Sequence, residues 1–358
     1  MAIQGAFTLN PNEIFASLAN MIISQEVFAD NLGKHQTLVD KARVDGSLYG
    51  DKKLYYATDV LESHEWGADA EAGNLLALDR PQDPEVQAIT LDVFRQIRLT
   101  VDNYLTKQAW SSEGAFSSFN SVMLGWMRET KRVYDGTLYN VFIGTNESAI
   151  GAQEQTVASK AAATPEAEAK VIAEKIATIL VEMGAYNRDY NDYGFLRSYG
   201  EDAIKVIWNS KFINKIRKVD LPAIFHKEGL VDKFEEEVLP ARYFGTKNAA
   251  KVVAGSNDGT YRSVIEKTYV KENVEYHVFP GDLIPSGVEI AVGEGYKVDA
   301  DIICKIVVKL PPFMSAFEVG TSFFNPRSLT ENHYLTFGHN TLAALKNYPF
   351  VTLRASAE

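Results

Sequence analysis

The sequence predicts an α+β protein, because segments with helical and with strand periodicity occupy separate stretches of its 358 residues. Apolar residues recur at three- and four-residue steps over 113–143 and again over 165–183, which is the spacing of one helix face. Apolar and polar residues alternate over 93–105, which is the spacing of a half-buried strand. Strand-like patterns then dominate from residue 262 onward.

The composition argues against several classes of protein. Hydrophobic residues make up 46% and charged residues 23% of the chain, as in globular proteins that bury a core. No apolar run is long enough for a transmembrane helix, and no basic residue precedes Lys34, so we also expect no secretory signal. The single cysteine, Cys304, allows no internal disulfide and fits a reducing compartment. The net charge of −11 argues against general affinity for nucleic acid.

The first third of the chain predicts a long hairpin. Residues 10–30 are expected to form one short helix, and residues 36–60 are expected to be extended, with mainly basic charges. The stretch 59–92 carries nine acids and one base, so it is a poor candidate for a packed core. The alternating strand over 93–105 follows. Two strands that bracket a polar excursion predict a hairpin projecting from the body of the protein.

Two helices are expected in the middle of the chain. The pattern over 113–143 predicts one long helix, in which Gly125 and Gly136 would allow a kink or a break. The second helix has clear boundary signals: Thr164 is a good N-cap, Pro165 suits the first helical position, and Gly184 can end it.

The C-terminal part predicts strands and a buried thiol. Gly293-Glu294-Gly295 is interpreted as a turn between two strands, because the helix that a phosphate-binding glycine loop must open does not follow it. Alternation over 302–310 places Cys304 on one face with apolar residues, as a small core side chain. The ending 347–354 (NYPFVTLR) predicts a closing strand.

The search for catalytic chemistry is negative. The sequence contains no phosphate loop, serine-nucleophile elbow, zinc helix or calcium loop. His333 and His339 lie six residues apart, which suits neither one helix face nor a common zinc hairpin. We therefore expect no catalytic residue, no metal and no cofactor. One basic cluster is compatible with nucleic-acid contact, but the acidic total favours a solvated face or a subunit contact; it comprises Lys205, Lys211, Lys215, Arg217 and Lys218, with Trp208 and Phe212 between them.

Three segments carry a resemblance to a known family. They are residues 43–60 (RVDGSLYGDKKLYYATDV), 118–146 (SFNSVMLGWMRETKRVYDGTLYNVFIGTN) and 322–354 (SFFNPRSLTENHYLTFGHNTLAALKNYPFVTLR). With the order of the elements, they resemble the major capsid protein of tailed bacteriophages, the Johnson fold. The resemblance implies an N-terminal arm over 1–35, an extended hairpin loop over 36–110 and a peripheral domain with a spine helix over 111–145. It also implies an axial domain over 146–260, and over 261–358 the rest of that domain with the return strands of the peripheral domain.

The resemblance also implies a function. It suggests a structural protein that self-assembles, as pentamers and hexamers, into the icosahedral head of a tailed phage and encloses its double-stranded DNA with weak contacts at most. Scaffolding, portal and head-decoration proteins are the further partners it implies, with synthesis in the bacterial cytoplasm and a final place in the virion. Three alternatives stay open: an encapsulin-like nanocompartment shell, a phage tail structural protein, and a hydrolase with a carboxylate-based site.

The charge pattern of the predicted hairpin indicates candidate contacts between subunits. A basic strand followed by an acidic stretch is the kind of charge segregation that fixes register between partners. We predict that Lys52 and Lys53, or Arg43, meet acids within 59–92 of a neighbouring subunit. Tyr55 and Tyr56, in the same predicted strand, are the remaining candidate contacts between subunits. The alternative is that these charges are independent and solvated.

Overall fold

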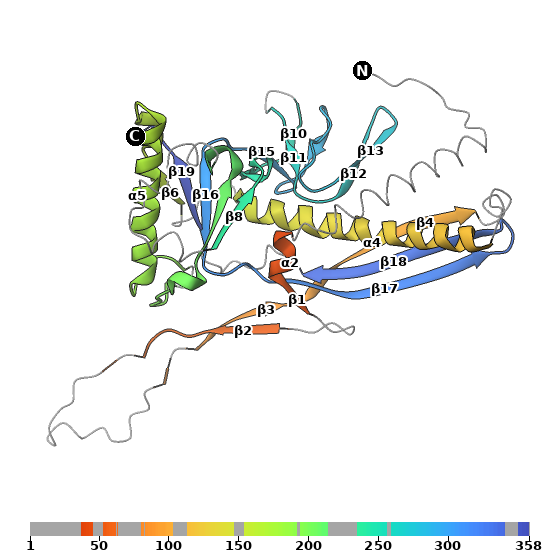
Figure 1. Cartoon of the computed structure of the whole chain (residues 1–358), viewed down its shortest axis with the longest axis horizontal. Coiled ribbons are helices and arrows are strands. Elements are labelled where there is room, and N and C mark those ends of the chain that lie inside the picture. Colours follow the sequence, from red (N-terminus) through yellow and green to blue (C-terminus); the bar gives the residue numbers. More distant parts are fainter. Residues whose placement is uncertain are drawn as a thin grey trace. The chain divides into compact units, whose positions relative to one another are not determined.

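The computed structural model describes residues 37–45, 53–61, 63, 80–81, 83–102, 113–146, 154–191, 194–213, 235–255, 259–340 and 350–357. These residues form two compact units, each assembled from segments far apart in the sequence (Figure 1). Unit 1 takes its described residues from Met1–Gly50, Leu91–Gly136 and Met314–His339, and unit 2 from Asp51–Thr90, Thr137–Phe313 and Asn340–Glu358. Helices and sheets occur in both units, which confirms the predicted α+β class.

Unit 1 is built on a four-stranded sheet. Its strand order is β1-β17-β18-β4, and two helices, α2 and α4, accompany it. The strands are β1 (Arg43–Asp45), β17 (Phe313–Asn325), β18 (Thr330–Asn340) and β4 (Leu91–Asp102), and the helices are α2 (Leu38–Ala42) and α4 (Glu113–Gly144). Strands β17 and β18 form a long antiparallel hairpin, with a bulge between Ala316 and Val319.

One face of this sheet packs on α4, the helix that lies along β17 and β18 in Figure 1. The ring of Tyr134 meets Phe337 edge-on at 5.7 Å between centroids, and its hydroxyl is 2.9 Å from Nε2 of His339. Side chains on the other face join neighbouring strands, since Thr100 Oγ1 donates a 2.7 Å hydrogen bond to Asn332. The helix runs unbroken through both of its glycines, so the predicted long helix is confirmed and the allowed break does not occur.

Unit 2 contains the larger core. A five-stranded sheet of order β6-β19-β16-β7-β8 packs against helix α5 (Pro165–Gly184), which lies beside it in Figure 1. The strands are β6 (Glu154–Val157), β19 (Phe350–Ala355), β16 (Ile302–Val307), β7 (Lys205–Asn209) and β8 (Glu235–Leu239). Helix α5 buries Ile172, Ile176 and Ile179, each of which stabilises the fold by roughly 1.5–3 kcal/mol. Cys304 in β16 is fully buried, as predicted.

The predicted ends of α5 are confirmed. The hydroxyl of Thr164 accepts a 3.3 Å hydrogen bond from the amide of Ala167, Pro165 begins the helix, and Gly184 is its last residue. The closing strand is confirmed as β19, and the predicted glycine turn lies between β14 (Glu289–Ile290) and β15 (Gly295–Val298), with Gly293 at a φ of +76°.

Smaller sheets complete unit 2. A second four-stranded sheet has the order β11-β15-β9-β5, and the described residues of this unit also form three two-stranded sheets. The remaining strands are β11 (Arg262–Ser263), β9 (Gly245–Lys247), β5 (Thr145–Asn146), β10 (Val252–Val253), which pairs with β14, β12 (Lys267–Lys271), which pairs with β13 (Val274–Val278), and β2 (Lys53–Ala57), which pairs with β3 (Glu85–Ile89). Short 3-10 helices cover Ser159–Ala161, Glu201–Ala203 and Ala241–Tyr243.

Two details of the predicted hairpin region were wrong. Residues 38–42 are helical, because the amide and the hydroxyl of Thr37 both donate to the Asp40 carboxylate, at 3.0 and 2.7 Å, and so close the first turn of α2. The strand predicted over 93–105 is β4, which joins the sheet of unit 1, and the partner of β2 is the nearer β3. The helix predicted over 10–30 lies outside the described residues.

Candidate functional site: the hairpin and its two anchors

The predicted subunit contacts fall on two elements. Arg43 begins β1 in unit 1, and Lys53, Tyr55 and Tyr56 belong to β2 in unit 2. Antiparallel pairing with β3 sets their register, with Lys53 opposite Ile89 and Tyr56 opposite Val86. Lys52 lies outside the described residues. The described residues therefore form a hairpin of β2 and β3, which is shorter than the one predicted from the sequence. It carries Lys53, Tyr55 and Tyr56, whereas Arg43 belongs to the other unit.

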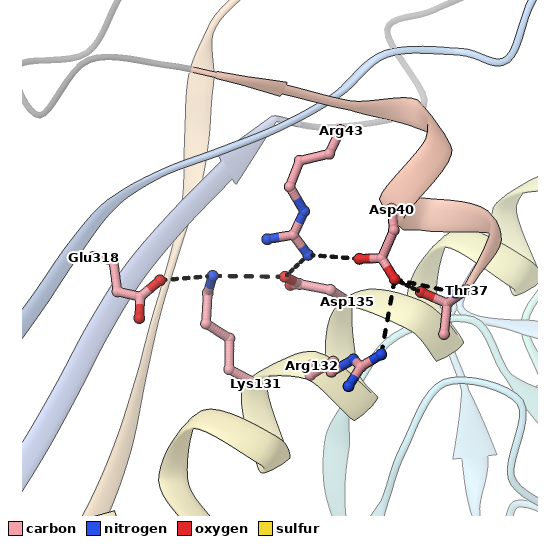
Figure 2. Close-up of polar contacts among 7 residues, drawn as sticks. All are labelled: Thr37, Asp40, Arg43, Lys131, Arg132, Asp135 and Glu318. Carbon is pink, nitrogen blue, oxygen red and sulfur yellow. Dashed lines mark hydrogen bonds and ion pairs between the residues drawn. The ribbon is translucent and has the colours of Figure 1, made fainter. Parts of the chain in front are cut away.

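The first anchor is an ion cluster in unit 1. Figure 2 shows Asp135 of α4 between Arg43 and Lys131, at 3.5 Å from Arg43 Nη2 and 3.7 Å from Lys131 Nζ. Lys131 also donates a 3.0 Å hydrogen bond to Glu318 of β17. On the other side, Asp40 of α2 lies 3.6 Å from Arg43 Nη2 and 4.0 Å from an Arg132 nitrogen. Three cations and three carboxylates thus connect α2 and β1 with α4 and β17.

Asp135 is the buried member of this cluster. Its side chain is 1% exposed, and neither carboxylate oxygen has a hydrogen-bond partner among the described residues. Burial raises the pKa of Asp135 to about 6, although the charges of Lys131 and Arg43 act to lower it. Asp40 behaves differently, because the hydrogen bonds from Thr37 and the nearby arginines outweigh partial burial and lower its pKa.

The second anchor lies in unit 2, directly after β2. Arg188 Nη1 donates a 2.6 Å hydrogen bond to Asp59 Oδ2, and the amide of Leu196 donates one of 3.0 Å to Asp59 Oδ1. The guanidinium of Arg197 also donates to the carbonyl oxygen of Thr58. The hydrogen bond from Arg188 is the main cause that lowers the pKa of Asp59 to about 2, and the Leu196 amide adds to it. This carboxylate is therefore ionised under all ordinary conditions.

Sequence reasoning missed most residues of both anchors. Lys131 and Asp135 are four residues apart on a predicted helix, so their pairing could be inferred from spacing alone. Arg188 and Arg197 carry no such signal, since their partner lies 129 to 139 positions earlier in the chain. For Arg43, the structure provides two carboxylate partners within its own chain.

Among the described residues, neither the single thiol nor the metal-ligating side chains form a reactive site. Burial strongly raises the pKa of the Cys304 thiol, which keeps it protonated and unreactive. Across the described ranges, no three His, Cys, Asp or Glu side chains are grouped so that they could hold a metal ion. In the same part of the chain, no helix combines the length and the apolar character needed to cross a membrane.

Comparison with known proteins identifies the family. The model of the Phi29-like phage major capsid protein family matches residues 3–353. Among solved structures, the chain is similar to one titled "Capsid structure of Staphylococcus phage Andhra", with a TM-score of 0.54 at 10% identity, over 86% of this chain and 80% of the other. It is also similar to a structure titled "Structure of head fiber and inner core protein gp22 of native bacteriophage P68", with a TM-score of 0.52 at 9% identity, over 86% and 81%. A search of curated proteins found no match.

The chain therefore belongs to the Phi29-like phage major capsid protein family. It has the phage capsid fold and is a structural protein of the head shell, as the resemblance implied. It self-associates into a multimeric shell and has its place in the virion. Its family indicates a structural rather than an enzymatic role, and none of the three alternative functions receives support.

Proposed function

We propose that this member of the Phi29-like phage major capsid protein family builds an icosahedral head from pentamers and hexamers and encloses double-stranded DNA. The match of the family model over residues 3–353 carries this proposal. The net charge of −11 supports a shell that contacts the packaged DNA weakly. We also infer scaffolding, portal and head-decoration proteins as partners, synthesis in the host cytoplasm, and the domain assignment given above: arm, extended hairpin, peripheral domain and axial domain.

The hairpin is proposed to make contacts between subunits. Five strand-paired positions, from Lys53 opposite Ile89 to Ala57 opposite Glu85, support a hairpin that keeps its own register. In this proposal the first strand of the hairpin faces acids within 59–92 of a neighbouring copy, through Lys52, Lys53, Tyr55 and Tyr56. One of those acids, Asp83, is exposed in this chain. Arg43 is also proposed to contact a neighbouring copy. Within its own chain it pairs with two carboxylates of unit 1, those of Asp40 and Asp135.

A charge-reversal experiment tests the hairpin contact. We expect the double variant Lys52→Glu/Lys53→Glu to remain a folded chain but to form few closed shells, because each reversed charge faces acids on the neighbour. Electron microscopy of assembly reactions, with sedimentation velocity beside it, counts shells and free subunits. The matched control is Lys170→Glu/Lys309→Glu, which changes the net charge equally at two exposed lysines outside the hairpin. Normal shells from the hairpin variant would contradict the proposal.

A further inference from the structure

The loop that follows α5 binds the two residues directly after strand β2. Two arginines and one backbone amide of this loop converge on the dipeptide Thr58-Asp59. We call Arg188, Leu196 and Arg197 the aspartate dock. Asp59 is the better buried partner, with 14% of its side chain exposed against 51% for Arg188. All these residues belong to unit 2.

The aspartate dock is ordered by its own hydrogen bonds. The amides of Asn187 and Arg197 each donate to the other's carbonyl oxygen at 2.9 Å, which closes the loop at its base. Asn191 spans the loop interior, where it accepts from the Phe195 amide at 2.9 Å and donates to the Phe195 carbonyl at 2.7 Å. Arg188 is itself positioned by a 2.7 Å hydrogen bond to the carbonyl of Gly194. The dock therefore does not need Asp59 in order to form.

Recognition uses only local features of the bound dipeptide. The dock reads one carboxylate and one backbone carbonyl, and the carboxylate also accepts a 2.8 Å hydrogen bond from the next amide, that of Val60. A charged arginine–carboxylate hydrogen bond is about twice as strong as a neutral one, so Asp59 supplies most of the specificity. Every copy of this chain carries the same dipeptide, and a second copy would present identical groups to the dock.

Exposed apolar side chains flank both partners in the sequence. Directly after Asp59, Val60 and Leu61 are 52% and 75% exposed. Two positions before Arg188, Tyr186 is 77% exposed. Such side chains stabilise a contact when a partner covers them, and each shell subunit has neighbours. Exposed apolar side chains next in sequence to both partners therefore favour a contact that a second copy would cover.

We propose that the aspartate dock is a docking site for an extended, aspartate-bearing segment and that in the shell it receives Asp59 of a second copy. Exchange of an identical segment preserves every hydrogen bond of the dock, which makes it a low-cost route to association. The inference rests on the proposed function, in which the hairpin reaches a neighbouring copy. It adds the receiving site and the residue that is recognised.

A peptide experiment tests recognition without any shell. The full chain carrying Asp59→Ala leaves its own dock empty, and a fluorescent peptide of residues 53–63 serves as the probe in an anisotropy titration. We expect this chain to bind the peptide, and a peptide with Asp59→Asn to bind about tenfold more weakly. Adding Arg188→Ala to the chain should weaken binding equally, whereas Lys170→Ala, on the exposed face of α5, should not change it. Equal binding of both peptides, or no binding, overturns the proposal.

A mixing experiment tests exchange between copies. The variants Asp59→Arg and Arg188→Asp each place like charges together when the segment docks within a chain or between identical copies. In a mixture of the two variants, exchange restores one arginine–aspartate pair for each contact between unlike chains. We expect shell yield from the mixture to exceed that of either variant alone, and an equal yield overturns docking between copies. The peptide experiment needs no assembly, so its failure would leave the hairpin contact of Lys52 and Lys53 unaffected. Normal shells from the Lys52 and Lys53 variant would likewise leave peptide binding by the dock unaffected.

Discussion

Asp135 in unit 1 and Asp59 in unit 2 are both paired with arginine, yet their pKa values shift in opposite directions. Asp135 lies 3.5 Å from Arg43 and makes no hydrogen bond among the described residues, and burial raises its pKa to about 6. Asp59 accepts hydrogen bonds from Arg188 and from two backbone amides, and these lower its pKa to about 2. The difference follows from burial and hydrogen bonds together. At Asp135 the cost of burial outweighs two nearby cations, whereas at Asp59 direct hydrogen-bond donors outweigh the cost of burial.

The two anchors therefore contribute differently to the fold. Taking the Asp135 charge out of water costs free energy that its two cations offset only in part, so its partners are essential once it is buried. Asp59 keeps some contact with solvent and has good geometry, so it acts as a tether that costs little to form and is also easily released.

The largest effect is expected from removing a partner of Asp135. Lys131→Met would leave this carboxylate with Arg43 alone, and breaking a buried ion pair from one side typically costs about 3 to 5 kcal/mol. Urea unfolding of the unassembled chain, followed by circular dichroism, measures the change. The control is Glu318→Gln, because Glu318 is 46% exposed and its pair with Lys131 should contribute under about 1 kcal/mol. Equal effects of the two variants would show that Asp135 is not the critical partner.

A smaller effect is expected in the pH dependence of unit 1. The folded pKa of Asp135, about 6, lies above its ordinary value of 3.8, so the folded chain binds this proton more tightly than the unfolded chain. The cost of the buried charge is present in full above the folded pKa and is relieved as pH falls through it. We expect the wild type to gain stability relative to Asp135→Asn between neutral pH and about pH 4, by at most about 3 kcal/mol. A difference that does not change with pH would contradict this assignment.

The smallest effect is expected at Asp59. Its folded pKa is lowered, so its contribution to stability is present above the ordinary value of 3.8 and is lost only as pH falls through about 2. We expect Asp59→Asn to speed amide exchange in residues 58–61 and 194–197 while the urea midpoint stays unchanged. Hydrogen exchange by mass spectrometry measures both segments. High salt should speed exchange there in the wild type by screening the pair, but it should change little around Asp135. If the amide exchange rate around Asp59 does not change with salt concentration, the contact between Asp59 and Arg188 is not held by charge.

Local pattern was sufficient for the helices and for much of the strand content. The apolar spacing of α4 and the Thr164-Pro165 signal of α5 depend on residues within a few turns of each other, and both helices begin and end close to the predicted positions. The capping box of Thr37 and Asp40 is an equally local signal, and it was missed because the surrounding residues 36–60 were interpreted as extended. The partner of β2 was also misjudged, since alternation predicts that a segment is a strand but not which strand it joins.

The sequence by itself determined the fold class, the two long helices, the buried thiol and the resemblance to phage capsid proteins, because these follow from periodicity and the order of elements. The tertiary structure decided how charged residues are used. It placed Arg43 against Asp40 and Asp135 and put Asp59 into the aspartate dock, 129 residues from Arg188. The presence of an aspartate in the sequence reveals neither how deeply its side chain is buried nor which donors it meets. Burial and donors together determine whether that aspartate stabilises or destabilises the fold.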